Sequence, residues 1–249
     1  MPRFLQPPLG LCVSMAVAIL TGCQATLQPA QPVSQAAGIG MDEGLLTPDV
    51  KSLDQSLLGA AAVGDEFLVK QLLAKSADVN AQDRLLGDTP LIKAVSGNHL
   101  AVARILLSAG ANPNYQNRAD ISAFLLAALK GQTDMVRLLL DHGADLRSVD
   151  RYGSTALISA CKRGHAQTTQ LLIAAGSNVN QVNRVGWSCL TGAVELGNGG
   201  PAYQAIVKAL IAAKADLNQP DKGGETALAH ARQRGQLEVV RLLEAAGAR

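Results

Sequence analysis

The stretch that decides the fold runs from Asp150 to Asn180 and reads DRYGSTALISACKRGHAQTTQLLIAAGSNVN. Near-copies of this stretch lie on both sides of it, and a glycine or asparagine in the middle of each copy sets the alignment. Self-similarity at a fixed period is the signature of a repeat architecture. The aligned positions are Gly64, Asn98, Gly131, Gly164, Gly197 and Gly235, at steps of 34, 33, 33, 33 and 38 residues.

Each unit is predicted to hold two short helices separated by a break. A hydroxyl such as that of Thr155 can cap the first helix, because it accepts a hydrogen bond from a free N–H of the first turn. Gly164 is expected to end the first helix, and Gly176 to end the second in the left-handed conformation. One such pair cannot bury its own apolar faces, whereas stacked pairs can. The cap hydroxyls are Thr89, Ser122, Thr155, Ser188 and Thr226.

These units resemble the ankyrin repeat. The resemblance is carried by GDTPLIKA from Gly87, YGSTALISA from Tyr152, GGETALAHA from Gly223 and VRLLLDHGAD from Val136. It covers about residues 51–249 and implies an all-α solenoid of about six helix-turn-helix repeats with short turn or β-hairpin fingers. The expected repeats are about 51–82, 83–115, 116–149, 150–182, 183–220 and 221–249.

The composition fits thin helices and excludes little else. Hydrophobic residues make up 48% of the 249 residues but aromatic residues only 3%, as alanine-packed helices require. The formal net charge is +2. Because this charge creates no strong field of either sign, the sequence predicts no nucleic-acid partner.

The N-terminus resembles a bacterial lipoprotein signal. Leu9 to Leu20 is an uncharged apolar run, too short to span a membrane but suited to a signal peptide. It ends in Leu-Thr-Gly before Cys23, which resembles the lipobox and implies cleavage before Cys23 and lipid attachment to it. A plain secretory signal, or an apolar N-terminus with a chance cysteine, is the alternative. Gln24 after the cysteine favours an outer-membrane anchor facing the periplasm.

The predicted domains are therefore a signal peptide over 1–22, a lipidated Cys23 with a flexible Gln/Pro/Ala tether over 23–50, and an ankyrin domain over 51–249. An insertion around Asn198 to Pro201 stretches the fifth repeat between its two helices. Insertions in repeats fall in loops, where they are either tolerated or functional. Both readings stay open here.

No catalytic or cofactor motif is recognisable in the chain. The sequence has no P-loop, no Gly-x-Gly-x-x-Gly and no Gly-x-Ser-x-Gly, and its histidines and cysteines lack metal-ligand spacing. His99 and His165 follow the mid-repeat position, where they are expected to make structural hydrogen bonds. We therefore expect no enzymatic activity, no cofactor and no metal.

Cys161 and Cys189 are expected to be buried free thiols. The position equivalent to Cys161 in the fifth repeat is Val194, five residues beyond Cys189, or about 7.5 Å of helix rise. Adding a gap of about 10 Å between neighbouring helices places the two Cα atoms beyond the roughly 7 Å that a disulfide allows.

The candidate binding site is the concave face that the fingers form with the first helices. One cation follows the opening Asp or Asn of each finger. Exposed Trp, Tyr and Arg are enriched at binding hot spots, which makes Tyr152 and Trp187 candidates too. Cations are common at this finger position in ankyrin repeats whatever they bind, which is the alternative. The predicted contact residues are Arg84, Asp88, Lys93, Arg118, Arg151, Tyr152, Ser154, Arg184, Trp187, Lys222 and Glu225, with Ser159 and His230 on the same face.

Three functions remain open at the level of sequence. The first is a monomeric, membrane-anchored adaptor or scaffold that binds an unidentified partner protein on the concave face. The second is an immunity or inhibitor protein that neutralises an envelope-acting enzyme or toxin with the same face. The third is a binder of anionic glycans or lipid headgroups, which would need no partner protein.

Overall fold

The regular secondary structure of the described chain is helical. The computed structural model describes residues 50–249, so the predicted signal peptide, the lipidation site at Cys23 and residues 24–49 of the tether lie outside the described residues. Within residues 50–249 there are twelve α-helices, and two isolated β-bridges in the fingers, Gln116–Ser122 and Val149–Thr155. The prediction of an all-α repeat fold with short fingers is confirmed.

The helices come in six pairs. The first helices are α1 (Val50–Val63), α3 (Pro90–Ser96), α5 (Ala123–Lys130), α7 (Ala156–Lys162), α9 (Cys189–Leu196) and α11 (Ala227–Gln233). The second helices are α2 (Glu66–Ala74), α4 (Leu100–Ser108), α6 (Thr133–Asp141), α8 (Ala166–Ala174), α10 (Pro201–Ala212) and α12 (Leu237–Ala245).

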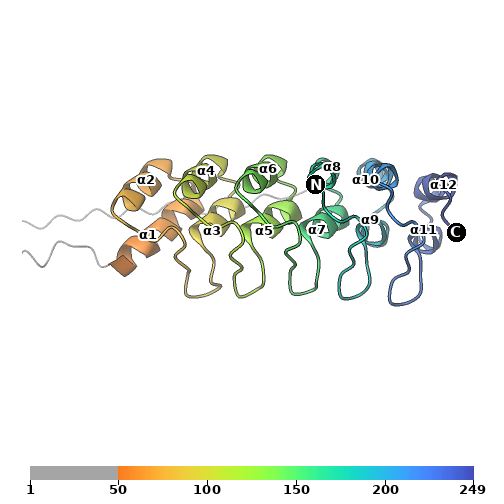
Figure 1. Cartoon of the computed structure of the whole chain (residues 1–249), viewed down its shortest axis with the longest axis horizontal. Coiled ribbons are helices and arrows are strands. Elements are labelled where there is room, and N and C mark those ends of the chain that lie inside the picture. The colour runs from red at the N-terminus through yellow and green to blue at the C-terminus, as the bar shows by residue number, and fades with distance from the viewer. Residues whose placement is uncertain (1–49) are drawn as a thin grey trace, which may run out of the picture. The chain divides into compact units, whose positions relative to one another are not determined.

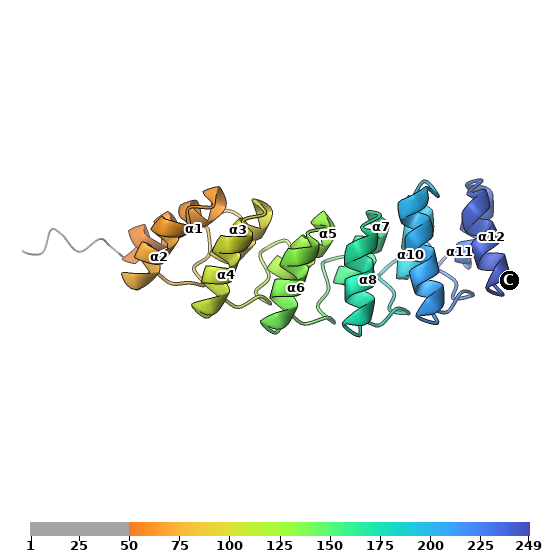
Figure 2. The same cartoon turned by 90° about the horizontal axis from the view of Figure 1, so that it is seen from above.

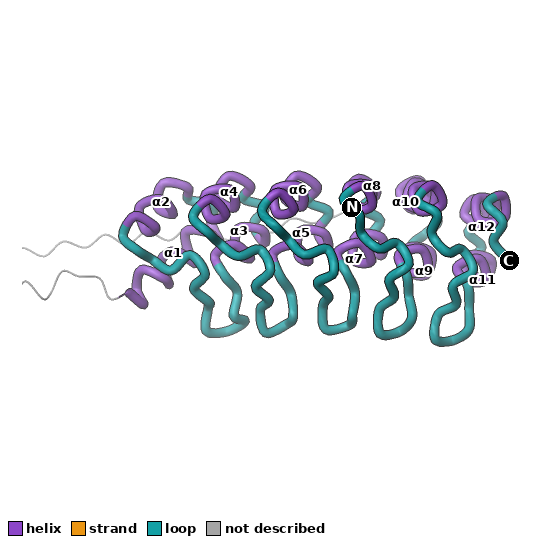
Figure 3. Tube along the Cα trace, in the orientation of Figure 1, coloured by secondary structure: helices purple, strands orange, loops and turns teal. Residues whose placement is uncertain are grey.

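Each set of helices forms its own row within the array. Figure 1 shows the second helices side by side in one row and the first helices in a parallel row. The view from above shows the second helices following one another in chain order (Figure 2). The loops that join each second helix to the next first helix extend past the first row as fingers, drawn in teal in Figure 3. Fingers and first helices together form one surface, which we call the finger face.

The predicted caps form as the sequence indicates. Each cap hydroxyl accepts a hydrogen bond from the backbone N–H three residues later, as in Thr155 Oγ1 with Ile158 N at 3.3 Å. Pro90 occupies the first position of α3, where its missing N–H costs no hydrogen bond. The glycine after each of four second helices has a φ of 83° to 91°, which confirms the left-handed ending. These are Gly110, Gly143, Gly176 and Gly247.

The insertion changes the break in the fifth repeat. Gly164 and its equivalents have a positive φ, but Gly197 is extended, with φ −84° and ψ 165°. The longer loop moves the left-handed residue to Gly199, with φ 68°, and α10 then begins at Pro201. The insertion lies between α9 and α10, as predicted, and α10 has twelve residues where α8 has nine.

A continuous apolar core runs between the two rows of helices. Small residues such as Ala94, Ala127 and Ala160 are fully buried in the first helices, and larger ones such as Leu106 and Leu139 in the second. Small side chains allow neighbouring first helices to approach closely, while leucines fill the space under the second row. The core therefore depends on stacking between repeats.

The expectation of two free thiols is wrong, because Cys161 and Cys189 form a disulfide. Their Cα atoms lie 5.5 Å apart, and both side chains are fully buried. The spacing argument assumes that equivalent residues of neighbouring helices lie side by side. The structure instead packs the end of α7 against the beginning of α9, since a Cβ on Gly192 would lie 2.9 Å from Cγ of Lys162. This offset cancels the axial rise that the spacing argument had added.

Asparagine side chains tie consecutive loops together on the side of the second-helix ends. Asn80 Oδ1 accepts a hydrogen bond from Asn112 N, and Asn114 Oδ1 accepts one from Asp145 N, each at 2.9 Å. Further along the array, Asn180 Oδ1 accepts a hydrogen bond from Asp216 N, and Asn218 Oδ1 accepts one from Arg249 N. These bonds fix the distance between neighbouring repeats.

Candidate functional site

One side chain at the base of each finger sets the shape of that finger. Asp83 Oδ1 accepts hydrogen bonds from three backbone N–H groups, those of Leu85, Leu86 and Gly87. Asp150 Oδ1 accepts them from Tyr152 N and Ser154 N, both at 2.8 Å. Asn and Asp favour such turns because the short side chain reaches the backbone two to four residues on. The bases of the other three fingers are Asn117, Asn183 and Asp221.

The predicted row of cations also links each finger to the one before it. Arg118 N donates to Leu86 O at 2.8 Å, and Arg184 N donates to Tyr152 O at 2.9 Å. The guanidinium of Arg118 bonds two carbonyls of the preceding finger, and that of Arg151 does likewise, at Arg118 O and Ala119 O. Two of the five cations therefore use their side chains to hold the array together.

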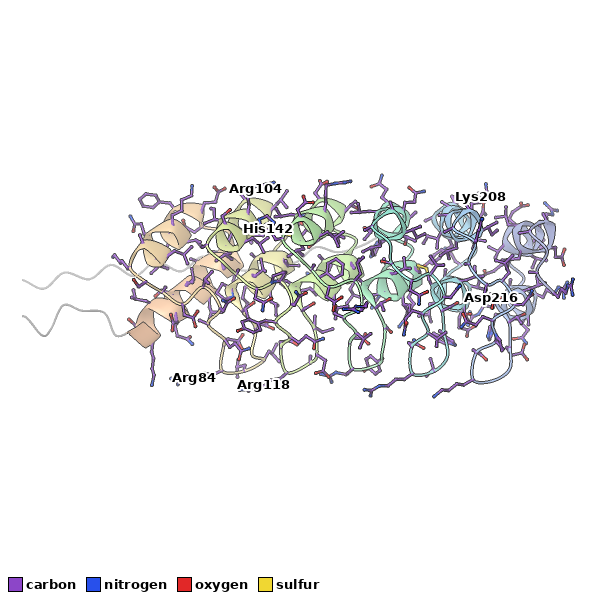
Figure 4. The ribbon with its side chains drawn as sticks, viewed as in Figure 1. Arg84, Arg104, Arg118, His142, Lys208 and Asp216 are labelled. Carbon is purple, nitrogen blue, oxygen red and sulfur yellow. A yellow bond between two sulfur atoms is a disulfide. The ribbon has the colours of Figure 1, made fainter. Side chains whose placement is uncertain are left out.

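The remaining three cations have no such side-chain partner among the described residues. Arg84, Arg184 and Lys222 are exposed, and within residues 50–249 their charged groups form no hydrogen bond or ion pair. In Figure 4, Arg84 and Arg118 lie at finger tips, while Arg104 and Lys208 lie among the second helices on the other side. These three cations are free to meet a ligand on the finger face.

The other predicted contact residues differ in accessibility. Tyr152 is exposed, whereas Trp187 and Glu225 are half-buried. Asp88 is buried and bonded to Lys93 and Asn117, and Ser154 is fully buried beside the Asn183 amide. Each finger folds back over its own base, so the side chains of Asp88 and Ser154 face inward. This corrects the prediction that these two side chains contact a partner.

Lys93 pairs with the finger of its own repeat. Its Nζ lies 2.6 Å from Asp83 Oδ2 and 2.9 Å from Asp88 Oδ2. Burial opposes ionisation of Asp83, but the hydrogen bonds from Lys93 and from two backbone N–H groups outweigh it and lower the pKa of Asp83 to about 2. Lys93 is thus part of the finger's support.

A second charged cluster joins the fifth and sixth repeats. His230 Nε2 lies 2.9 Å from Asp221 Oδ2 and His230 Nδ1 lies 3.1 Å from Glu195 Oε2. Arg234 binds both oxygens of Glu195, and this hydrogen bonding lowers the pKa of Glu195. Burial raises and the hydrogen bond with His230 lowers the pKa of Asp221, and the lowering prevails. His230 therefore has the same kind of role as Lys93.

A groove of about 690 Å³ opens in the middle of the finger face. It is lined by Ser159 of α7 and by Asp150 and Tyr152 of the third finger, which belongs to the fourth repeat. Lys162 and Arg163 lie at the end of α7. The groove is completed by Ile121, Leu129, Leu196 and Tyr203.

The insertion in the fifth repeat contributes to this groove. Tyr203 lies in α10, just after the inserted loop, and its ring packs where a Cβ on Gly164 would lie, at 2.9 Å. In other repeats a histidine ring takes that place, as His165 does beside Gly131. The longer α10 thus brings a tyrosine to the groove, which the sequence reasoning did not foresee.

The sequence reasoning also missed apolar residues beside the cations. Leu85 is 84% exposed, Tyr152 64% and Val185 52%. Each directly follows a predicted finger cation, and only Tyr152 had been singled out. The signal was present, since a large apolar residue at a finger tip cannot be buried by its own repeat.

The histidines expected to be structural prove to be so. His99 Nε2 lies 3.1 Å from Ala62 O, and His165 Nε2 lies 3.0 Å from Leu129 O, each bridging to the preceding repeat. Gln132 and Gln236 make comparable bonds to preceding carbonyls. Among residues 50–249, no three side chains of the metal-ligating types gather into a potential metal site.

None of the helices between residues 50 and 249 has the length and apolar character needed to cross a bilayer. The described residues form a helical array with an exposed face of fingers, cations and a central groove.

Sequence comparison places the chain in the ankyrin-repeat family. The family model for ankyrin repeats in three copies matches residues 57–150, 106–183, 124–220 and 166–249. The chain belongs to this family, whose members are in general binding scaffolds without catalytic activity.

Relatives of known sequence and structure share this array. The putative ankyrin repeat protein YahD of Escherichia coli K12 is 38% identical over 200 residues, 80% of this chain and 99% of YahD. An ankyrin repeat domain from Acinetobacter baumannii AYE, known from a crystal structure, is 45% identical with a TM-score of 0.74, covering 78% of this chain and 98% of that one. The mouse 2-5A-dependent ribonuclease is 38% identical over 77 residues, 31% of this chain but only 10% of the ribonuclease.

Proposed function

We propose that this protein is a membrane-anchored ankyrin adaptor that binds one partner protein through its finger face. One observation carries the proposal: the first, third and fourth fingers present an exposed cation beside an exposed apolar residue, as in Arg84 with Leu85 and Arg184 with Val185. Charged and apolar groups held on adjacent rigid loops suit a protein surface, since cations steer association and apolar groups supply buried area.

The proposed location is the bacterial envelope, with the array facing the periplasm. The resemblance of the segment around Cys23 to a lipobox supports an anchor there, and Gln24 supports the outer membrane. The buried Cys161–Cys189 disulfide adds a further argument. Disulfides persist in oxidising compartments such as the periplasm and are rare in the cytosol.

The protein is proposed to act as a monomer without catalytic activity. In this arrangement the tether would hold the array near the membrane, and the finger face would remain open to a partner. Whether the partner keeps its activity when bound distinguishes an adaptor from an inhibitor.

The test uses two charge-reversal variants of the chain starting at Gln24, which retains the whole array. Arg184→Glu/Lys222→Glu alters the finger face, and Arg104→Glu/Lys208→Glu makes the same charge change among the second helices (Figure 4). All four side chains are exposed, so circular dichroism should show each variant folded. Partners are captured from envelope extract with each protein.

We expect one partner to bind the parent and the second-helix variant and to be lost from the finger variant. Equal capture by the parent and both variants would contradict the finger-face proposal. Loss on the Arg104→Glu/Lys208→Glu variant alone would place the site among the second helices. Assaying the captured partner with and without this protein then decides between adaptor and inhibitor.

A further inference from the structure

In the second and sixth repeats, the fourth residue of the first helix contacts the finger base of its own repeat. In the second repeat this residue is Lys93, whose Nζ is 2.6 Å from Asp83 Oδ2. In the sixth repeat it is His230, whose Nε2 is 2.9 Å from Asp221 Oδ2. Two finger-base carboxylates are therefore each satisfied by a basic side chain from the helix beneath.

The fourth repeat has the carboxylate without the base. Its finger-base residue is Asp150, and the fourth residue of α7 is Ser159. Asp150 Oδ1 accepts two backbone hydrogen bonds, while the carboxylate forms no ion pair with any described residue. Because serine is three heavy atoms shorter than lysine, the space that Lys93 fills in the second repeat stays open here.

The groove on the finger face occupies this space. Both Asp150 and Ser159 line its volume of about 690 Å³. Gly192 has the same position in α9, where the Lys162 side chain lies beside it. The hollow beside Asp150 therefore arises at Ser159, where the second and sixth repeats have a basic residue.

The other groups of the groove suit a long basic side chain. Tyr152 is exposed beside Asp150, and Tyr203 and Leu196 offer apolar surface to a hydrocarbon stem. Aromatic rings attract a cation electrostatically, by about 0.5–1 kcal/mol at exposed sites. At the other end, Lys162 and Arg163 form no ion pair with any described residue, so the same ligand can place a carboxylate there.

We infer that this groove binds a lysine or arginine side chain of the partner protein, which pairs with Asp150 as Lys93 pairs with Asp83. A nearby carboxylate of the partner meets Lys162 and Arg163. The partner segment thus carries both charges, which a wholly acidic surface would not satisfy. This inference rests on the proposed function and specifies the chemistry that the finger face recognises.

Two substitutions isolate the Asp150 interaction without disturbing the finger. Asp150→Asn keeps an oxygen for the two backbone bonds, as Asn117 and Asn183 do in neighbouring fingers, and removes the charge. Ser159→Lys places a basic side chain on α7, at the position that Lys93 has in the second repeat. It should fill the groove and leave the fold intact.

The probe is a library of random dodecapeptides displayed on phage, selected against the chain from Gln24. Selected peptides are synthesised, and their affinities are measured for the parent, Asp150→Asn, Ser159→Lys and Arg184→Glu/Lys222→Glu. Each peptide is also made with norleucine in place of its shared basic residue. Norleucine keeps the stem and removes the charge, which completes a double-mutant cycle with Asp150→Asn.

We expect the selected peptides to share a lysine or arginine and to bind Asp150→Asn and Ser159→Lys at least tenfold more weakly. The norleucine peptides should lose no further affinity on Asp150→Asn. If the peptides bind both groove variants with unchanged affinity but lose binding to Arg184→Glu/Lys222→Glu, this inference is overturned and the proposed function stands. If the peptides bind every variant with unchanged affinity, or if the selection enriches no peptide, both this inference and the proposed function are overturned.

Discussion

The second and fourth repeats are built from the same units but are held together differently. In the second repeat, Lys93 pairs with the finger base Asp83, and Asn80 ties the loop before the repeat to the loop after it. The fourth repeat has Ser159 at the position of Lys93, and the loop before it has Arg147 at the position of Asn80, so both bonds are missing. It has instead a buried disulfide to the fifth repeat.

This difference shows that a repeat can be stabilised while its finger face stays accessible. Surface bonds that stabilise a repeat also fill its finger face, as Lys93 does. A covalent link between α7 and α9 lies in the core, where it leaves the face above it free. The middle of the array can therefore keep an open groove without depending on the bonds that close it elsewhere.

The largest expected effect is on the disulfide. The double substitution Cys161→Ala/Cys189→Ala removes a link that closes a loop with a sequence separation of 28 residues. Loop-closure entropy for a ring of this size gives a loss of about 3–4 kcal/mol in the free energy of unfolding. For a domain of this size this corresponds to a fall of about 10 °C in the melting temperature.

The chain from Gln24 contains no other cysteine, which makes the measurement simple. Calorimetry should show that a reductant lowers the melting temperature of the parent towards that of the double variant and leaves the variant unchanged. Two reactive thiols in the denatured, unreduced parent would contradict the disulfide. An unchanged melting temperature in the variant would show that repeat stacking alone holds the junction.

The second effect concerns the charged pair that the fourth repeat lacks. The pKa of Asp83 is lowered from 3.8 to about 2 in the folded protein. Its ionised form therefore stabilises the fold above pH 3.8, and this contribution is lost as the pH falls towards 2. The lowering corresponds to about 2 kcal/mol.

Urea unfolding from pH 5 to pH 2 measures this contribution. We expect the parent to lose about 2 kcal/mol more than Asp83→Asn over this range, because the variant has no carboxylate to protonate at that site. Asp150→Asn is the matched control, since Asp150 has the same place in its finger but faces no cation. Parallel curves for the parent and Asp83→Asn would contradict a stabilising pair.

Local features of this fold could be predicted from the sequence, because neighbouring residues determine them. The cap of Thr155 needs only a hydroxyl before a helix, and the left-handed Gly176 needs only a helix end. The disulfide could not be predicted this way, since it depends on how far α9 is offset along α7. That offset is set by packing between repeats.

The candidate site likewise has some features that could be predicted from the sequence and others that could not. The row of cations from Arg84 to Lys222 was visible as one residue per period, and their places on successive fingers follow from it. Lys93 and Ser154 were expected at the surface, but one pairs with its finger and the other is buried beneath it. The groove escaped prediction because it depends on Ser159 and on Tyr203, and Tyr203 reaches the groove only because the insertion precedes α10.

The smallest expected effect is on the missing loop tie. A cavity of about 300 Å³ lies where the tie would form, lined by Arg147, Ser177 and Asn178 among others. Arg147→Asn should place an oxygen near Asn178 N, as Asn114 does for Asp145 N, and stabilise the protein by about 0.5–1 kcal/mol. The melting temperature should rise by about 1–4 °C. Arg147→Ala is the control, because it removes the arginine without adding an acceptor. If both variants have the same melting temperature, the loops on either side of the fourth repeat need no tie. The missing bond would then cost the protein no stability on this side of the array.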